Sequence, residues 1–127
     1  MDKKVIKTAH ALRSIGPYSQ AVEAGGFVFV SGQIPIDPES GNVEQVDIKA
    51  QTRRVMENAH AILSAAGCGM SKVVKATIYL KNISDFADVN EVYGGYFPSD
   101  PPARATVEVS RLPKDVSVEM DFIAWKG

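Results

Sequence analysis

The chain has 127 residues, of which 45% are hydrophobic and 23% are charged, and its formal net charge is −1. These values are those of a compact globular protein, so we expect residues 1–127 to form a single domain around a buried core. A charge this close to neutral argues against nucleic acid as a partner, because proteins that bind phosphate groups usually carry a basic excess.

The single cysteine, Cys68, excludes an internal disulfide and suits a reducing compartment. No apolar run follows the first residues as in a secretory signal, and no stretch approaches the roughly 20 apolar residues that span a bilayer. We therefore expect a cytoplasmic protein that has no membrane partner.

The first half of the chain predicts three strands and a long helix. Residues 4–8 suit a short edge strand, and Gly25-Gly26 joins residues 21–24 and 27–31 into a hairpin. From Ile48 to Ala66, apolar residues recur at the three- and four-residue spacings of one helical face, and Gly67 provides a stop.

The second half predicts one helix among three strands. Residues 73–80 are rich in β-branched and aromatic side chains and suit a fourth strand. Ser84 suits the N-cap of a second helix, whose apolar face carries Phe86, Val89, Tyr93 and Phe97 and which ends at Pro98. Strands at 103–110 and 115–125 complete the order β-β-β-α-β-α-β-β, which predicts an α+β domain with two helices on one face of a single sheet.

The second face of this sheet needs a cover. Residues 27–30, Phe-Val-Phe-Val, are apolar on both sides of their strand, and two helices leave little chain to cover the second face. We therefore expect the protein to associate with copies of itself through that face.

Two polar rows on the last strands are candidates for chemistry. Arg104 and Thr106 share one side of their strand, and Glu119 lies in the alternating polar row of the last strand. If these strands form a hairpin with Ser110 opposite Asp115, Thr106 faces Glu119 and Arg104 lies one pleat away. An odd-numbered loop or a bulge would separate the rows.

An arginine and a glutamate on one face suit the binding and hydrolysis of a small acid. The planar guanidinium of Arg104 matches a carboxylate, and the carboxylate of Glu119 can take a proton from water. Such a pair is also common as a neutralised or solvated feature of a sheet, and from these two residues alone that interpretation is the stronger one.

Other residues could form a pocket or serve the fold alone. Tyr18 follows a Gly16-Pro17 turn and either stacks on a ligand or fills the edge of the core. Ser31-Gly32 ends an apolar strand, where glycine permits close backbone approach or a β-bulge. Asn90 shares the buried face of the second helix and needs a hydrogen-bond partner there. His10 and His60 lack metal-ligand spacing, no loop of the phosphate-cradling type occurs, and Cys68 has no neighbouring histidine, so we expect no metal and an inert thiol.

Five motifs in register resemble the Rid (YjgF) family, in its archetypal deaminase subgroup. They are Gly16-Pro-Tyr-Ser-Gln, Ser31-Gly-Gln-Ile-Pro, Asn90-Glu-Val-Tyr followed by Tyr96-Phe97, Pro102-Ala-Arg-Ala-Thr-Val-Glu-Val, and Arg111-Leu-Pro-Lys-Asp. The resemblance implies a chorismate-mutase-like (YjgF) fold with a single mixed sheet, assembled as a homotrimer with a pocket at each subunit interface.

The resemblance also implies an activity, the hydrolysis of 2-iminobutanoate and 2-iminopropanoate to 2-oxo acids and ammonia without a cofactor. By position, Arg104 would bind the substrate carboxylate, Glu119 would activate water and Tyr18 would flank the imine. Ser31, Gly32, Asn90 and the backbone of Thr106 would shape the pocket. The subgroup more often has cysteine at the position of Thr106. Two alternatives are a regulatory module that binds a carboxylate without turnover and a translation-inhibiting ribonuclease, which the net charge and the absence of a histidine pair disfavour.

Overall fold

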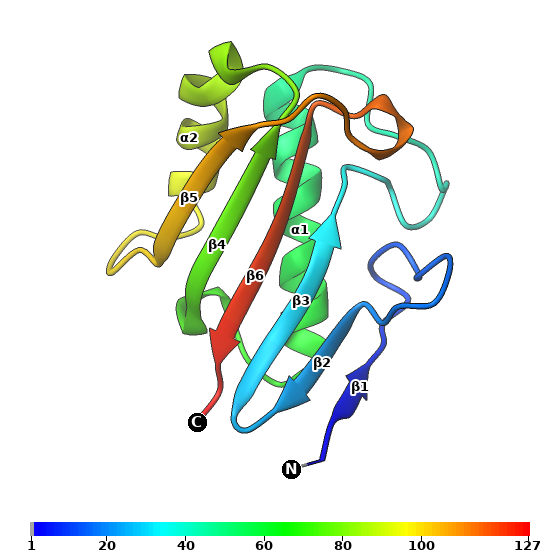
Figure 1. The fold of residues 1–127 in the computed structure, drawn as a ribbon, viewed down its shortest axis with the longest axis vertical. Helices are drawn as coiled ribbons and strands as arrows, with labels where there is room; N and C mark the ends of the chain where they lie inside the picture. The colour runs from blue at the N-terminus through cyan, green and yellow to red at the C-terminus, as the bar shows by residue number, and fades with distance from the viewer. Residues whose placement is uncertain (1) are drawn as a thin grey trace.

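The computed structural model describes residues 2–127, in which six strands form one sheet and two helices lie against one of its faces (Figure 1). The helices are α1 (Ile48–Ala65) and α2 (Phe86–Gly94), and single 3-10 turns are η1 (Met70–Lys72), η2 (Ile83–Asp85) and η3 (Pro113–Asp115). The strands are β1 (Lys4–Ile6), β2 (Ala21–Ala24), β3 (Phe27–Gln33), β4 (Val73–Leu80), β5 (Ala103–Glu108) and β6 (Val118–Trp125). The predicted α+β order β-β-β-α-β-α-β-β is confirmed.

The strands lie in the order β1-β2-β3-β6-β4-β5. All neighbours are antiparallel except β4 and β5, which are parallel, so the sheet is mixed. A parallel pair needs a long crossover, and the chain between β4 and β5 supplies one through η2 and α2.

The supposed hairpin of the last two strands is wrong. β4 lies between β5 and β6, so β5 pairs with β4 and has no ladder with β6. The link between β5 and β6 instead contains the turn η3 and passes the end of β4 (Figure 1).

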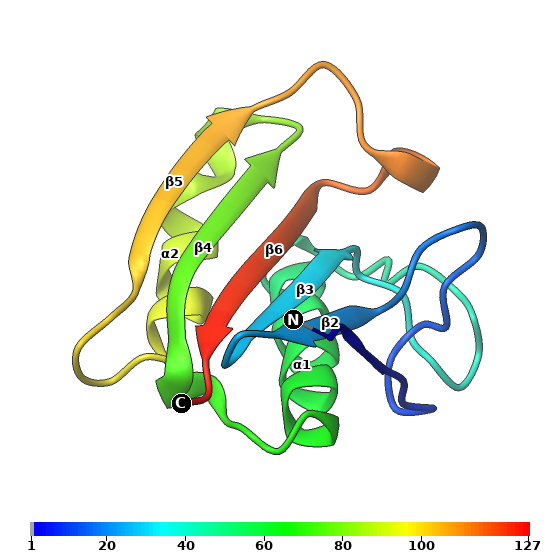
Figure 2. The same cartoon turned by 60° about the horizontal axis from the view of Figure 1, so that its bottom comes forward.

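The core lies between the sheet and the helices. Alternate residues of β6, from Val118 to Ala124, are fully or almost fully buried, as are Val55, Ala59 and Ile62 of α1. α1 packs against the centre of the sheet and α2 lies behind β4 and β5 (Figure 2). The period-two burial of the strands and the helical face of α1 are those that the sequence predicts.

Helix α1 has a capping group at each end. The side chain of Asp47 accepts a hydrogen bond of 2.8 Å from the backbone of Ala50. At the other end, Gly67 has a φ of +81°, and the amide of Cys68 donates to the carbonyl of Leu63. This Schellman motif explains the predicted stop at Gly67.

The predicted cap of the second helix is wrong. Ser84 lies inside η2, where its amide and hydroxyl both donate to the side chain of Asn82. An extra 3-10 turn therefore precedes α2, which begins at Phe86.

The face of the sheet opposite the helices is apolar and open. Exposed side chains on it include Val5, Phe27, Phe29, Val107 and Trp125. The rings of Phe27 and Phe29 lie 6.2 Å apart between centroids. None of the helices in residues 2–127 is long and apolar enough to cross a membrane.

Removing the cap of α1 should destabilise the protein. We expect Asp47→Ala to lower the free energy of unfolding by about 1 kcal/mol, because it leaves a helix amide without its acceptor. Urea denaturation followed by circular dichroism measures this loss. Asp85→Ala is the matched control, since Asp85 precedes α2 without a side-chain cap bond. Equal losses in the two variants would contradict the capping role.

Candidate functional site

Strand β5 directs Arg104 and Thr106 towards α2. In the parallel ladder, Arg104 lies beside Ala76 and Thr106 beside Ile78. Ala76 and Ile78 are fully buried under the helices. Because paired residues project to the same face of a sheet, Arg104 and Thr106 lie on the helix-covered face.

Three residues of α2 hold the guanidinium of Arg104. Its Nη1 donates a hydrogen bond of 2.7 Å to Oδ1 of Asn90. Its central carbon lies 5.5 Å from the ring centroid of Phe86 and 5.0 Å from that of Tyr93. Positions 86, 90 and 93 share one helical face, so α2 presents an amide between two rings. The predicted need of Asn90 for a partner is met by Arg104.

Most N–H donors of the Arg104 guanidinium remain available to a ligand. None of the ion pairs within residues 2–127 includes Arg104, and its one side-chain bond goes to a neutral amide. The hydroxyl of Thr106, on the same face of β5, and that of Tyr93, in α2, are buried without a hydrogen-bond partner in the described chain. The guanidinium of Arg104 is thus half-buried, fixed in position and not paired with a carboxylate of the described chain. Such a group is suited to bind the carboxylate of a ligand.

Glu119 lies on the other face of the sheet. It pairs with Tyr79 of β4, whereas Arg104 pairs with Ala76. Position 79 lies three positions after position 76, and an odd offset along a strand places two side chains on opposite faces. The prediction that Arg104 and Glu119 share one face of a single chain is therefore wrong, because β4 stands where a hairpin was assumed.

Glu119 forms a second group with Tyr18, Ser31 and Gly32. These residues line a pocket of about 440 Å³ at the end of β3. The ladder between β3 and β6 is irregular between Val30 and Gln33, which lets the backbone at Gly32 approach the Glu119 side chain. A Cβ on Gly32 would lie 3.1 Å from Cδ of Glu119 and closer still to Oε2. The interpretation of Gly32 as part of an irregular strand end agrees with this ladder, and the backbone approaches a carboxylate of the protein itself. Close approach of Gly32 to a ligand stays a prediction.

Tyr18 and Ser31 differ in their freedom. The side chain of Tyr18 is 49% exposed at the mouth of this pocket. The Ser31 hydroxyl donates a hydrogen bond of 2.6 Å to the carbonyl of Ser19, and so ties β3 to the loop that carries Tyr18. Ser31 therefore shapes the pocket by holding this loop.

The surroundings of Glu119 favour its protonated form. Burial raises the pKa of the Glu119 carboxyl, and the negative charge of Asp121, two residues along β6, raises it further. Asp121 itself accepts a hydrogen bond of 2.9 Å from the hydroxyl of Tyr79. A carboxylate with a raised pKa takes a proton from water more readily than an ordinary carboxylate does.

Within residues 2–127, no cluster of three or more His, Cys, Asp and Glu side chains has the arrangement of a metal site. Cys68 is a free, partly buried thiol, and burial is the main cause that raises its pKa.

Sequence reasoning missed the contacts of Phe86 and Tyr93 with Arg104. The helical spacing of Phe86, Asn90 and Tyr93 was visible, but the strand residue that they face was not. That residue depends on β5 lying at the sheet edge under α2, which no local pattern encodes.

Comparison with known proteins agrees with this fold along the whole chain. The profile of the family described as endoribonuclease L-PSP matches residues 8–126. A RutC family protein of Pyrococcus abyssi is 59% identical over 126 residues, 99% of each chain. The 2-iminobutanoate/2-iminopropanoate deaminase of Salmonella typhimurium is 47% identical over 124 residues, 95% of this chain and 96% of the relative.

Among solved structures, the chain is similar to E. coli TdcF, whose crystal structure contains bound serine. The two sequences are 42% identical, the match covers 98% of this chain and 99% of TdcF, and the structures superpose with a TM-score of 0.94. The predicted YjgF-type fold, with two helices on one mixed sheet, is therefore confirmed. Given the family profile and these relatives, the chain belongs to the Rid (YjgF) family, whose profile carries the description endoribonuclease L-PSP.

Proposed function

We propose that the protein hydrolyses small 2-imino acids, such as 2-iminobutanoate and 2-iminopropanoate, to 2-oxo acids and ammonia. The observation that carries this proposal is the guanidinium of Arg104, held by Asn90 and two rings and without a protein carboxylate in the described chain. Two relatives support it. The Salmonella relative is named for this reaction, and TdcF holds serine, which carries a carboxylate next to a nitrogen.

The reaction asks little of the protein. Arg104 binds the substrate carboxylate, and Glu119 takes a proton from water as its oxygen bonds to the imine carbon. Glu119 passes this proton, and then the proton of the new hydroxyl group, to the nitrogen. The carbon–nitrogen bond then breaks, ammonia leaves and the carbon–oxygen double bond forms. An imine carbon is already electrophilic, so positioning supplies much of the rate. Tyr18 flanks the imine.

The remaining pocket residues have supporting roles in this proposal. Ser31 and Gly32 shape the wall beside Glu119, and Asn90 holds Arg104. Thr106 contributes its backbone amide, a role that is compatible with threonine where the subgroup more often has cysteine.

A complete site requires more than one copy of the chain. Arg104 and Glu119 lie on opposite faces, and β5 is an edge strand of the sheet. The open apolar face is suited to pack against other copies, as in an obligate interface. We propose a homotrimer in which Arg104 of one copy meets Glu119 of its neighbour, and the reducing cytoplasm, to which the free Cys68 is suited, as its compartment.

A regulatory module that binds a carboxylate without turnover would use the same Arg104. Glu119→Gln distinguishes the two functions, because it removes the base but keeps a polar side chain of the same size. In the enzyme, turnover should collapse while binding of 2-oxobutanoate, measured by calorimetry, persists. Cleavage of RNA by the purified protein that is abolished in Arg104→Ala would support the ribonuclease function instead.

Replacing the guanidinium should remove most of the activity. We expect Arg104→Lys to lower kcat/KM about 100-fold, because an ammonium lacks the two-donor fork and one charge-assisted hydrogen bond is worth about 1.5–3 kcal/mol. A coupled assay that generates 2-iminobutanoate in situ measures the change. Arg53→Lys on the exposed side of α1 is the matched control. Wild-type turnover by Arg104→Lys or Arg104→Ala would refute the binding role.

The activity should fall at acid pH. Glu119 acts as a base only when ionised, so its raised pKa means that turnover is full above that pKa and is lost as the pH falls through it. Asp121→Asn removes one of the two causes of the shift and should move the acid limb of the pH–rate profile to lower pH. Asp115→Asn, which changes a carboxylate paired with Lys81, is the control. An acid limb that stays in place in Asp121→Asn would argue against Glu119 as the base.

Charge on the open face should break the assembly. Phe29→Glu places a carboxylate among apolar side chains of β3 and should yield monomers that lack activity. Sedimentation velocity and the coupled assay measure both effects. Val46→Glu is the control, since Val46 is exposed in the loop before α1. A wild-type protein that is monomeric at micromolar concentration would contradict the proposed homotrimer.

A further inference from the structure

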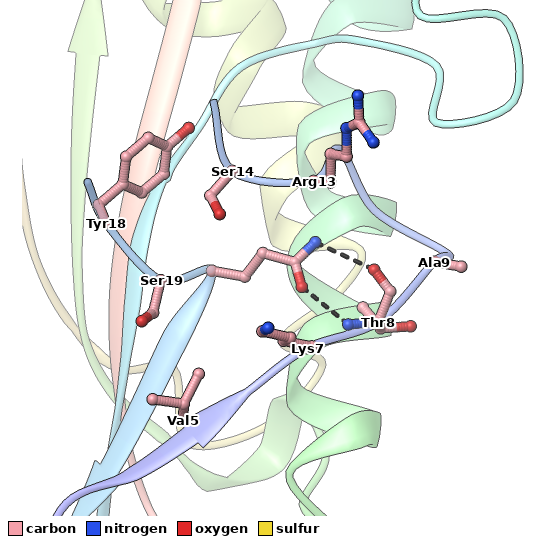
Figure 3. A pocket seen from close by; sticks show the side chains of 9 residues that line it. Val5, Lys7, Thr8, Ala9, Arg13, Ser14, Tyr18 and Ser19 are labelled. Atoms are coloured by element: carbon pink, nitrogen blue, oxygen red, sulfur yellow. Dashed lines mark hydrogen bonds between the residues drawn. The ribbon is translucent and has the colours of Figure 1, made fainter. Parts of the chain in front are cut away.

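A second pocket adjoins the pocket of Glu119 at Tyr18. It has a volume of about 730 Å³ and is bordered by the end of β1 and the loop that leads to β2 (Figure 3). Tyr18 and Gln20 line both this pocket and the pocket of Glu119. The two cavities are therefore neighbours that share a wall.

The charge of this second pocket is one-sided. Lys7 and Arg13 are the charged residues among those that line it, and both are cations. Neither takes part in an ion pair or a side-chain hydrogen bond within residues 2–127. Figure 3 shows Lys7 among the other lining side chains and the guanidinium of Arg13 turned away from them, at the rim.

Neutral donors accompany these cations. Ser14, Ser19 and Tyr18 also line the pocket, and no hydrogen bond within residues 2–127 uses their hydroxyls. The hydroxyl of Ser14 points into the space between Tyr18 and Thr8 (Figure 3). Two cations with three available hydroxyls form the donor set that carboxylates and phosphates bind.

A buried glutamine holds the pocket in shape. Gln20 is 4% exposed, and its side-chain oxygen accepts from the amide of Thr8 at 2.7 Å. Its nitrogen donates to the carbonyls of Thr8 at 3.0 Å and Leu12 at 2.9 Å. These bonds fix the segment between Lys7 and Arg13 before any ligand arrives, which lowers the entropy cost of binding.

We propose that this pocket binds an anionic group of a small molecule beside the hydrolytic site. Its volume suits a metabolite, and the net charge of −1 does not favour a polyanion. The anion has two sources. It is the second carboxylate of a dicarboxylic imino acid that reaches past Tyr18, or it is a separate small anion. The first source rests on the proposed function, and the second does not.

The test uses the double variant Lys7→Gln/Arg13→Gln in the full chain. Both side chains are exposed, so the fold should persist, which the thermal midpoint checks. Arg53→Gln/Lys72→Gln is the matched control, because it removes two exposed cations that lie elsewhere. Neither pair belongs to the proposed catalytic machinery.

The kinetic arm compares the imino acid formed from glutamate with 2-iminobutanoate. If the pocket takes the second carboxylate of the substrate, the double variant should lower kcat/KM for the dicarboxylic substrate about tenfold and leave that for 2-iminobutanoate unchanged. The control variant should change neither value.

The binding arm titrates inorganic phosphate and 2-oxoglutarate into Arg104→Ala protein by calorimetry. If the pocket takes a separate anion, binding should persist without Arg104, and adding Lys7→Gln/Arg13→Gln should weaken it about tenfold. A double variant that matches its control in both arms would overturn the proposal. Wild-type protein that hydrolyses no imino acid would refute the proposed function, while the binding arm would still decide the pocket.

Discussion

The position of β4 between β5 and β6 is the constraint on which the arrangement of the site depends. Helix α2 carries the chain from the end of β4 back to the start of a parallel neighbour, so β5 becomes an edge strand. Arg104 then projects to the same face of the sheet as its partner Ala76. Glu119 projects to the opposite face, together with its partner Tyr79. A hairpin of the last two strands would have joined the two groups in one chain. The observed order separates them, and this separation is the physical reason for the proposal that the site lies between subunits.

Each separated group is organised by its own neighbours. On the helix-covered face, α2 fixes the guanidinium of Arg104 with one amide and two ring faces. Cation–π contacts of a partly desolvated guanidinium are worth about 0.5–2 kcal/mol each, and they orient the fork without neutralising its charge. On the other face, the irregular end of β3 brings Gly32 against the Glu119 carboxyl, and burial raises the pKa of that group. The first arrangement keeps a cation available for a ligand, and the second raises the pKa of a carboxyl group, as the proposed proton transfer requires.

The open face of the sheet connects the fold with the proposed assembly. Its exposed aromatic and aliphatic side chains share this face with three polar residues, Tyr79, Glu119 and Asp121. Contiguous exposed apolar surface of this kind usually marks an interface. If the open faces of several copies packed together, their apolar side chains would be buried. The edge strand β5 of one copy would then lie near the Glu119 pocket of its neighbour. In this scheme the same association that covers the open face of the sheet would complete the site.

Local pattern alone determined much of this protein. The spacing of apolar residues and the stop at Gly67 define α1, the alternation of residues defines the strands, and the five motifs identify the family, because each of these signals depends on near neighbours in the chain. Only the tertiary structure decided which strand lies beside β5, that Phe86 and Tyr93 enclose Arg104, and that Glu119 faces away from it. These features depend on pairings between residues far apart in sequence, and a shift of register by one residue turns every side chain of a strand to the other face.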